Sequence, residues 1–221
     1  VESTRDTTIA ELEAGRTTAA SSFVLPPTPV HLRTPQHDYG TVGVALAGAH
    51  QLGNALVAVR VLELLEQQGL PIGTAAVRAG LEGVRWPGRL DARRLPDGRE
   101  LLLDAAHNRD GARALASHLG QRFPGRYPLV FAAMRDKDAA GMLADLLPHA
   151  SAAVFTRASN PRSADPVELA AVARTMAPEL PIEVCVTPVE ALAAAWRFGP
   201  RIVVAGSIFL LGHVIEELER P

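Results

Sequence analysis

The chain has 221 residues, of which 48% are hydrophobic and 21% charged, a composition that excludes a disordered protein and allows one large or two modest domains. Its formal net charge of -2, from 22 basic and 24 acidic residues, gives no reason to expect nucleic acid or an anionic membrane as a partner. The single cysteine, Cys185, excludes an internal disulfide, and without a signal peptide in the sequence we expect a cytoplasmic protein.

The first part of the chain is predicted to contain two helices after a polar start. Residues 1–25 are rich in Thr, Ala and Ser, and the prolines of 26–29 favour an extended connector. Apolar residues at three- and four-residue steps predict a helix within 45–68, and a shorter helix is predicted over 74–83. Asn54 lies on the first turns of the longer helix, in the segment GAHQLGNA.

The character of the sequence changes after Trp86-Pro87-Gly88, where we place a domain boundary. Two strands, 90–95 and 100–104, are predicted on either side of the turn Pro96-Asp97-Gly98. Apolar runs and helices then alternate to the end of the chain. The helices are predicted over 110–121, 138–147, 166–176, 189–198 and 208–219, and the apolar runs between them over 129–134, 152–156, 182–186 and 202–205. This alternation is typical of an α/β fold with a mostly parallel sheet covered by helices on both faces. The longest apolar run, 202–211, is interrupted by Gly206-Ser207 and is too short to cross a bilayer.

Three of the predicted strands end in clusters of polar residues. The clusters are Asp104-Ala105-Ala106-His107-Asn108, Arg135-Asp136-Lys137-Asp138 and Gly206-Ser207, the last at the start of a helix whose amides could hold a carboxylate or a phosphate. Because ligands of open parallel sheets bind beyond the carboxyl ends of the strands, we expect Asp104, Lys137 and Ser207 near one edge. Each cluster also has a structural interpretation: Asp110 and Asp138 can cap helices, and Gly206 can permit a tight turn.

Two further motifs precede these clusters. Trp86-Pro87-Gly88-Arg89 lies at the predicted domain junction, where ligand sites are common, although Arg89 can equally be a surface charge. Asn54 can contact a ligand or lie on a solvated helix face, and His50 is expected to be a structural histidine. No pair of histidines has the helical spacing of a zinc site, so we predict no metal site in this chain.

The chain resembles the folylpolyglutamate and dihydrofolate synthases, which share the three-domain plan of the Mur ligases. Five segments carry the resemblance, in the same order and at similar distances: HQLGNA, GLEGVRWPGRLD, LLLDAAHNRDGARAL, VFAAMRDKDAAGML and AGSIFLLG. The resemblance extends from about Gly48 to the end of the chain, and His-Gln before the helix asparagine favours the folate branch over other Mur ligases. Ala105 and Arg109 stand where the family usually has Gly and Pro, which affects the shape of the loop more than its functional groups.

The resemblance implies two regions of unequal completeness. Residues 87–221 correspond to the complete Rossmann-like carboxyl-terminal domain, and residues 1–86 to the carboxyl-terminal part of the central ligase domain. Family members begin with a nucleotide-binding domain that carries the phosphate loop G-x-x-G-K-[ST], and this motif does not occur here. The implied partner is therefore the missing amino-terminal ATPase domain of the same polypeptide, which would also hold the magnesium ligands, and the isolated chain is expected to be inactive.

The activity implied by the resemblance is the ATP- and Mg²⁺-dependent addition of L-glutamate to dihydropteroate or to a folate through an acyl phosphate. The residues expected to bind ATP are Asn54, Arg89 and Asp104, those expected to bind glutamate are His107, Ser207 and Lys137, and the catalytic candidates are Arg89 and His107. Arg89 suits a phosphate contact because its guanidinium can donate two parallel hydrogen bonds.

Three alternatives stay open. Another Mur-type amino-acid ligase would share most of these motifs. A hydrolase could use Asp104, His107 and Ser207 as a triad, although the G-x-S-x-G motif of such enzymes is absent. A non-catalytic module that binds a nucleotide or an amino acid would fit a chain without the phosphate loop.

Overall fold

The computed structural model describes residues 7–11 and 20–220 and divides the chain into two units. The first unit contains residues 7–11 and 26–86, and the second contains residues 20–25 and 87–220. The division after Trp86 falls where the sequence changes character, but residues 20–25, which we had assigned to the first region, belong to the second unit. Within the described ranges, no helix combines the length and the apolar character that crossing a membrane requires.

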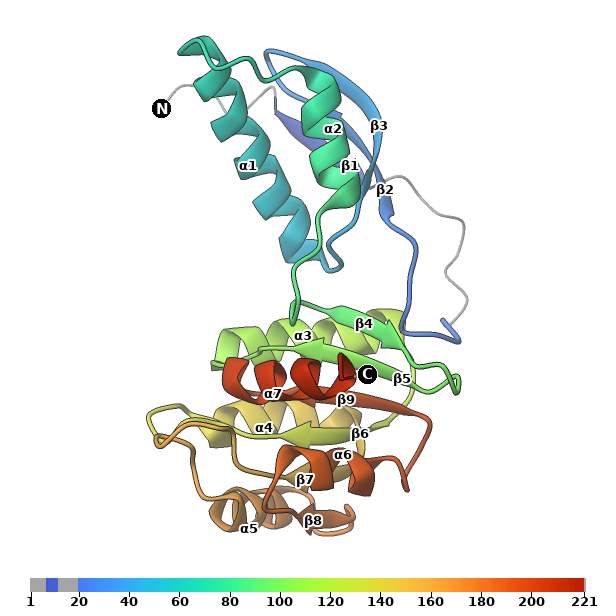
Figure 1. Cartoon of the computed structure of the whole chain (residues 1–221), viewed down its shortest axis with the longest axis vertical. Coiled ribbons are helices and arrows are strands. Elements are labelled where there is room, and N and C mark those ends of the chain that lie inside the picture. Colours follow the sequence, from blue (N-terminus) through green and yellow to red (C-terminus); the bar gives the residue numbers. More distant parts are fainter. Residues whose placement is uncertain (1–6, 12–19, 221) are drawn as a thin grey trace. The chain divides into compact units, whose positions relative to one another are not determined.

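The first unit consists of a three-stranded antiparallel sheet and two helices (Figure 1). Its elements are β1 (Thr8–Glu11), β2 (Thr28–Arg33), β3 (Asp38–Val44), α1 (Ala49–Gln67) and α2 (Thr74–Gly83). Both helices were predicted, but the three strands were not. The interpretation of 26–29 as a connector was wrong in part, since β2 begins at Thr28 and includes Pro29. Proline is tolerated there because it lies near the start of the strand.

One side of α1 packs on this sheet. The buried core cluster of the first unit contains Leu32, Tyr39, Val42, Val59 and Val77. Glu63 of α1 is also buried, and its carboxylate accepts hydrogen bonds from the hydroxyls of Thr34 and Tyr39, the latter at 2.9 Å. Burial and the neighbouring Glu63 carboxylate raise the pKa of Tyr39, so its hydroxyl stays a hydrogen-bond donor to Glu63.

The second unit contains a six-stranded sheet with the strand order β4-β5-β9-β6-β7-β8. The strands are β4 (Asp91–Arg94), β5 (Glu100–Asp104), β6 (Tyr127–Phe131), β7 (Ala150–Phe155), β8 (Ile182–Val184) and β9 (Arg201–Ala205). The edge strand β4 is antiparallel to β5, and the other pairings are parallel. The predicted α/β class with a mostly parallel sheet is therefore confirmed.

Helices cover both faces of this sheet (Figure 1). They are α3 (Arg109–Arg122), α4 (Ala139–Leu146) with the short 3-10 turn η2 (Leu147–His149), α5 (Pro166–Met176), α6 (Pro188–Ala195) and α7 (Ile208–Leu218). The connections from β5 through β8 run in one direction along the sheet, so their right-handed crossovers place α3, α4 and α5 on one face. The chain then returns to insert β9 between β5 and β6, which places α6 on the other face with α7.

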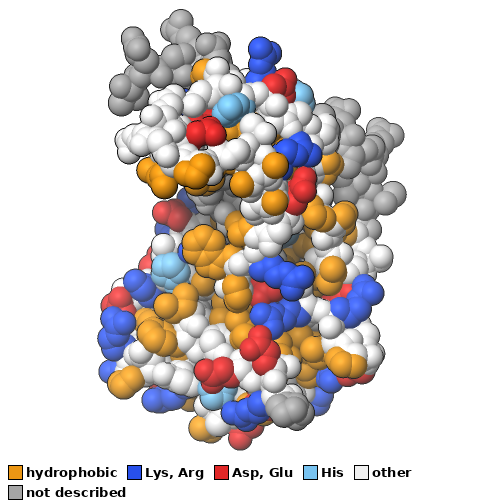
Figure 2. Space-filling view, turned by 45° about the horizontal axis from the view of Figure 1, so that its top comes forward, with side chains coloured by type: hydrophobic (Ala, Val, Ile, Leu, Met, Phe, Trp, Pro, Cys, Tyr) orange, Lys and Arg blue, Asp and Glu red, His pale blue; other side chains and the backbone are white. Residues whose placement is uncertain are grey.

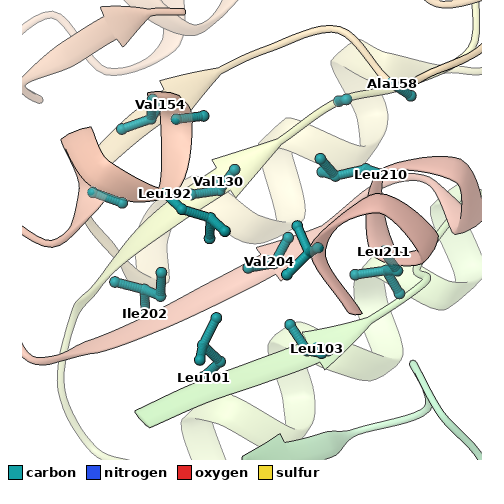
Figure 3. Close-up of a cluster of buried hydrophobic side chains, with 14 of the residues drawn as sticks. Leu101, Leu103, Val130, Val154, Ala158, Leu192, Ile202, Val204, Leu210 and Leu211 are labelled. Atoms are coloured by element: carbon teal, nitrogen blue, oxygen red, sulfur yellow. The ribbon is translucent and has the colours of Figure 1, made fainter. Parts of the chain in front are cut away.

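The core between the sheet and α6 and α7 is made of alternate strand residues, the inner residues of these two helices and a few loop residues (Figure 3). Its labelled members are Leu101, Leu103, Val130, Val154, Ala158, Leu192, Ile202, Val204, Leu210 and Leu211. The intervening residues of the central strands are buried against the opposite helix layer, and every residue of β5 is buried. This burial on both faces explains why these strands appear in the sequence as continuous apolar runs.

Residues 20–25 are joined to the second unit through Phe23 and Ser22. The side chain of Phe23 is 2% exposed, and its ring packs against the rings of Phe123 and Tyr127 at centroid distances of 5.0 and 4.9 Å. The Glu100 carboxylate accepts hydrogen bonds from the Ser22 hydroxyl (2.7 Å) and the Phe23 amide (2.8 Å). The segment was assigned to the wrong region because one buried aromatic residue in a polar stretch leaves no periodic pattern.

Candidate functional site

Three of the predicted site residues lie at one edge of the six-stranded sheet. Strands β5, β9 and β6 are adjacent and parallel, so they end at the same edge, called here the carboxyl edge. Asp104 is the last residue of β5, Ser207 follows β9, and Lys137 lies in the loop after β6. The order of connection also changes here, because β9 separates β5 from β6, and such switch points are the usual ligand sites of open α/β sheets.

Asp104 is buried and holds two backbone turns with its carboxylate. Its Oδ2 accepts a hydrogen bond from the Leu90 amide and its Oδ1 from the Ala106 amide, each at 2.9 Å. Leu90 and Ala106 have φ angles of 46° and 33°, in the left-handed region that residues with a Cβ rarely adopt. In addition, the Ala105 amide donates to the Gly88 carbonyl at 2.9 Å. These bonds stabilise the strained backbone next to the end of β5.

Arg89 lies in the turn that Asp104 holds, residues 87–90, called here the Arg89 turn. Gly88 has a φ of 74°, and a Cβ at this position would lie 2.8 Å from the Leu211 Cδ1 of α7. The Gly88 amide donates to the Asp91 carboxylate at 3.2 Å. The backbone that carries Arg89 is therefore fixed by Asp104 at the end of β5, by Leu211 of α7 and by Asp91. The Arg89 side chain is exposed.

The loop between β5 and α3 contains His107, which is half-buried. The residue that caps α3 is Asn108, whose Oδ1 accepts from the Gly111 amide at 2.8 Å, and not Asp110, which lies in the first turn. The predicted cap by Asp110 was therefore wrong. A Cβ on Gly111 would lie 3.1 Å from the Ala106 Cα, so the start of α3 closely approaches the turn that Asp104 holds.

Gly206 and Ser207 form the turn between β9 and α7. Gly206 has a φ of 103°, and a Cβ there would lie 2.3 Å from the Ala132 carbonyl oxygen and 2.6 Å from the Phe131 ring. The Gly206 amide donates to the Ala105 carbonyl at 3.1 Å. The buried Ser207 hydroxyl accepts from the Phe209 amide at 3.2 Å and so caps α7.

The loop after β6 carries Lys137 and is joined to the loop after β7. The Lys137 Nζ lies 3.4 Å from the Asp136 carboxylate. The Asp136 carboxylate accepts a hydrogen bond from the Asp136 backbone amide. This bond and the Lys137 ammonium lower the pKa of Asp136. Asp138 caps α4 as predicted, accepting from the Gly141 amide at 2.8 Å.

Arg135 belongs to a polar cluster predicted from the sequence, but no role was predicted for it. Its Nε donates to the Ser163 carbonyl at 3.1 Å, and its guanidinium also donates to the Pro161 carbonyl. These acceptors are backbone atoms in the loop after β7, so no side-chain pattern marked them. The turn residues Asn160-Pro161 were the available signal of an ordered loop at this edge.

The other predicted residues lie elsewhere or cannot be described. Asn54 belongs to the first unit, where it is exposed on α1 and its amide donates to the Gln51 Oε1 at 3.1 Å. The side chain of His50 lies outside the described residues. Basic and acidic side chains are interspersed over the face of the molecule in Figure 2, in keeping with the near balance of charge in the sequence.

This arrangement matches a known protein family. Residues 88–208, more than half of the chain, match the family described as Mur ligase, glutamate ligase domain. The chain belongs to this Mur ligase family. The dihydrofolate synthase/folylpolyglutamate synthase of Mycobacterium tuberculosis is 37% identical over 165 residues, covering 73% of this chain and 29% of that protein. The enzyme of the same name from Bacillus subtilis is 33% identical over 133 residues, covering 59% and 30%.

Solved structures of Mur ligase family members have the same fold. Mycobacterium tuberculosis folylpolyglutamate synthase, complexed with ADP and AMPPCP, has a TM-score of 0.79 and 29% identity, covering 90% of this chain and 47% of that chain. Folylpolyglutamate synthase from Thermotoga maritima has a TM-score of 0.77 and 28% identity, covering 97% and 47%. The chain thus spans between 29% and 47% of the length of these four relatives.

Proposed function

We propose that this chain is the carboxyl-terminal part of an ATP-dependent ligase that adds L-glutamate to dihydropteroate or to a folate. The observation that carries the proposal is the match of residues 88–208 to a glutamate ligase domain, in a chain whose relatives are named dihydrofolate synthase and folylpolyglutamate synthase. The phosphate loop of the family is then expected in the part of the ligase that precedes this chain.

The proposed reaction has two steps. First, a carboxylate oxygen of the pteroate or folate substrate attacks the γ-phosphorus of ATP, and ADP leaves. The amine nitrogen of glutamate then attacks the carbonyl carbon of the acyl phosphate, phosphate leaves, and the nitrogen loses a proton as the amide forms. The protein has to neutralise the phosphate charge, orient both substrates and exclude water that would hydrolyse the acyl phosphate.

Arg89 suits the neutralisation of phosphate charge. Its side chain is exposed and its backbone is fixed at the carboxyl edge, so the turn itself need not reorganise when charge develops on the phosphate. Its guanidinium can donate two parallel hydrogen bonds to one phosphate. Asp104 stays a candidate ATP contact, and its bonds to Leu90 and Ala106 give it a positioning role as well. We propose Asn54 as the ATP contact from α1.

Glutamate binding is proposed for the residues on the other strand ends. The Lys137 ammonium is paired with a half-exposed neighbour, Asp136, and can bind a substrate carboxylate in its place. The Ser207 hydroxyl accepts from the backbone of α7, and its hydrogen remains able to donate to a ligand oxygen. We propose that His107, in the loop after β5, binds the glutamate amine and accepts its proton.

Magnesium binding is not assigned to this part of the ligase. In the described portion of the chain, no group of three or more His, Cys, Asp or Glu side chains is placed to hold a metal ion. On the basis of the family resemblance, we propose that the magnesium ligands lie in the part of the ligase outside this chain.

The test is an assay of ADP release by a complete ligase that contains this chain. With dihydropteroate or a folate present, ADP release should depend on L-glutamate and stop when glutamate is omitted. Release that depends on another amino acid would favour a different Mur-type ligase. No release with any amino acid would favour a non-catalytic binding module.

A further inference from the structure

The connection between β1 and β2 leaves the first unit and returns to it. These two strands are antiparallel neighbours, with Glu11 opposite Val30. Antiparallel neighbours are usually joined by a loop of about two to five residues. Here the strands are joined by residues 12–27, of which residues 20–25 belong to the second unit. Residues 20–25 are called here the strap.

Phe23 anchors the strap in the second unit. Its buried ring packs on the rings of Phe123 and Tyr127. The Arg201 Cζ lies 5.7 Å from the centroid of the Phe23 ring, within the range of a cation–π contact. Tyr127 and Arg201 are the first residues of β6 and β9, so the anchor lies at the edge of the sheet where the parallel strands begin. This edge, called here the amino edge, is opposite the carboxyl edge.

The strap is also held by a charged group at the amino edge. The carboxylate of Glu100, the first residue of β5, accepts hydrogen bonds from the Ser22 hydroxyl and the Phe23 amide. The Arg94 guanidinium donates to the same carboxylate at 2.7 Å and to the Ser22 Oγ at 3.1 Å. Hydrogen bonds to ionised groups are stronger than those between neutral groups, so the strap is firmly attached to the start of β5.

The other connection between the units enters the second unit at the opposite end of the same strand. Helix α2 ends at Gly83, and the chain then enters the Arg89 turn. Asp104, the last residue of β5, holds this turn through the Leu90 amide. At the usual rise of a strand, the two ends of β5 are about 13 Å apart. The second unit is therefore attached to the first at two separate points.

Both connections are short. Residues 24–27 join the anchored Phe23 to β2, and residues 84–86 join α2 to the Arg89 turn. A fully extended chain of such a length spans at most about 18 Å. Residues 26 and 27 are both proline, which restricts the backbone of the first connection further. Neither connection can therefore act as a long flexible linker.

We propose that the strap is a second tether that restricts the motion of the second unit against the first. Domains that are joined by one linker normally move relative to each other. A rigid body held at one point can turn in every direction, whereas a body held at two separate points turns only about the line that joins them. With the strap in place, the remaining motion is a hinge motion about the direction of β5.

The consequence for catalysis rests on the proposed function, in which Asn54 of the first unit and Arg89 of the second contact the same ATP. A second tether removes arrangements of the two units in which these residues cannot act together. Binding of ATP then has less conformational freedom to remove, which lowers its entropic cost. The strap is attached at the amino edge, so it acts by positioning the units and not by contacting the ligand.

The test measures the distribution of distances between two spin labels, one on each unit, in the 221-residue chain. The native thiol is removed by Cys185→Ser, and the labels are attached at two exposed helix positions through Ala79→Cys in α2 and Arg174→Cys in α5. Pulsed electron spin resonance then reports the width of the distribution in frozen solution. A wide distribution means that the two units sample many arrangements.

The main variant carries a flexible Gly-Ser segment of about six residues between Leu25 and Pro26, which lengthens the tether and leaves the Phe23 anchor intact. It should at least double the width of the distribution. The matched control carries the same segment between Gly69 and Leu70, in the turn between α1 and α2, and should keep the width of the parent. Both insertions are made at positions that are not buried, so both should keep the thermal melting curve of the parent.

A second variant keeps the length of the chain and changes only its stiffness. Pro26→Gly combined with Pro27→Gly should broaden the distribution, by less than the insertion does, because glycine restores the backbone freedom that proline removes. Both prolines are exposed, so this variant tests the tether even where the insertion prevents folding.

Two results would overturn the proposal. One is the width of the parent in both strap variants, and the other is equal broadening by the strap insertion and the control insertion. The measurement contains no ATP, folate or glutamate, so an error in the proposed substrates cannot produce either result. In a complete ligase, the strap insertion should raise the KM for ATP several-fold. An unchanged KM together with a broadened distribution would contradict the link to ATP binding alone.

Discussion

The Asp104 carboxylate and the Leu90 backbone amide are joined by a hydrogen bond of 2.9 Å, which fixes the Arg89 turn to the end of β5. The donor and the acceptor lie in different segments, and the residue between Gly88 and Leu90 is the exposed Arg89. A fixed backbone removes the ordering of the turn from the cost of bringing the cation to a phosphate. The buried carboxylate of Asp104 therefore supports the proposed phosphate contact of the exposed Arg89 guanidinium.

Asp104→Ala should lower the free energy of unfolding by about 2–4 kcal/mol, because the buried amides of Leu90 and Ala106 both lose their acceptor. Urea denaturation measures this change. Asp110→Ala is the control, since that side chain is 94% exposed and its removal should change stability by about 0.5 kcal/mol or less. Equal losses in the two variants would show that Asp104 does not stabilise the turns.

Gly206→Ala should destabilise the second unit by more than about 3 kcal/mol or prevent its folding. The new Cβ would lie 2.3 Å from the Ala132 carbonyl oxygen, on a backbone with a φ of 103°. Gly212→Ala is the matched control: it lies within α7, has no atom within 4 Å of the added Cβ, and should stabilise by up to about 1 kcal/mol. Thermal melts of both variants decide the point, and a stable Gly206→Ala protein would contradict this account of the β9–α7 turn.

Phe23→Ala should lower the free energy of unfolding by about 3–5 kcal/mol, the usual result of removing a buried aromatic ring. The loss should appear in the unfolding of the second unit, since the ring packs against Phe123 and Tyr127. Val24→Ala, at a side chain that is 46% exposed, should have little effect on the same denaturation curve. If both variants unfold like the parent chain, residues 20–25 do not belong to the second unit.

The stabilising contribution of the ionised Glu100 carboxylate to the second unit should be lost as the pH falls into the acid range. Burial raises the pKa of its carboxyl, but hydrogen bonds from Ser22, from Arg94 and from a backbone amide lower it, and the net shift is downward from the ordinary value of 4.5. A lowered pKa in the folded state stabilises the protein above the unfolded-state value, and this contribution is lost as the pH falls through the folded-state pKa. Urea midpoints measured from neutral pH downward should therefore fall less steeply in Glu100→Gln than in the parent. Parallel curves would remove Glu100 as a source of acid sensitivity.

Much of the second unit could be predicted from sequence because its signals are local. The bounds of β5 were predicted as found, because its apolar run follows a turn. Those of α5 were predicted as found, because a proline begins the helix. Strands β2 and β3 were missed. In β2 only alternate residues, Val30 and Leu32, are buried, and the prolines before them indicate a connector.

The site was predictable only in part, for a related reason. Strand ends are visible in the sequence, so Asp104, Lys137 and Ser207 could be placed at one edge. The bond from Leu90 to Asp104 could not be predicted, because its donor is a backbone amide and any residue supplies one. The link from Arg135 to the loop after β7 was missed for the same reason, since both its acceptors are backbone carbonyls.

The most direct test of the account is the steady-state rate of glutamate addition at saturating ATP in a complete ligase that carries Arg89→Ala or Arg89→Lys. Arg89→Ala should lose about 3 kcal/mol in transition-state stabilisation, roughly a hundredfold in rate, and should change the thermal melt far less than the rate. Arg89→Lys should restore only part of the rate, because an ammonium cannot donate two parallel hydrogen bonds to one phosphate. If Arg89→Ala keeps most of the parent rate, Arg89 does not act on the phosphates, and the Arg89 turn has a packing role only.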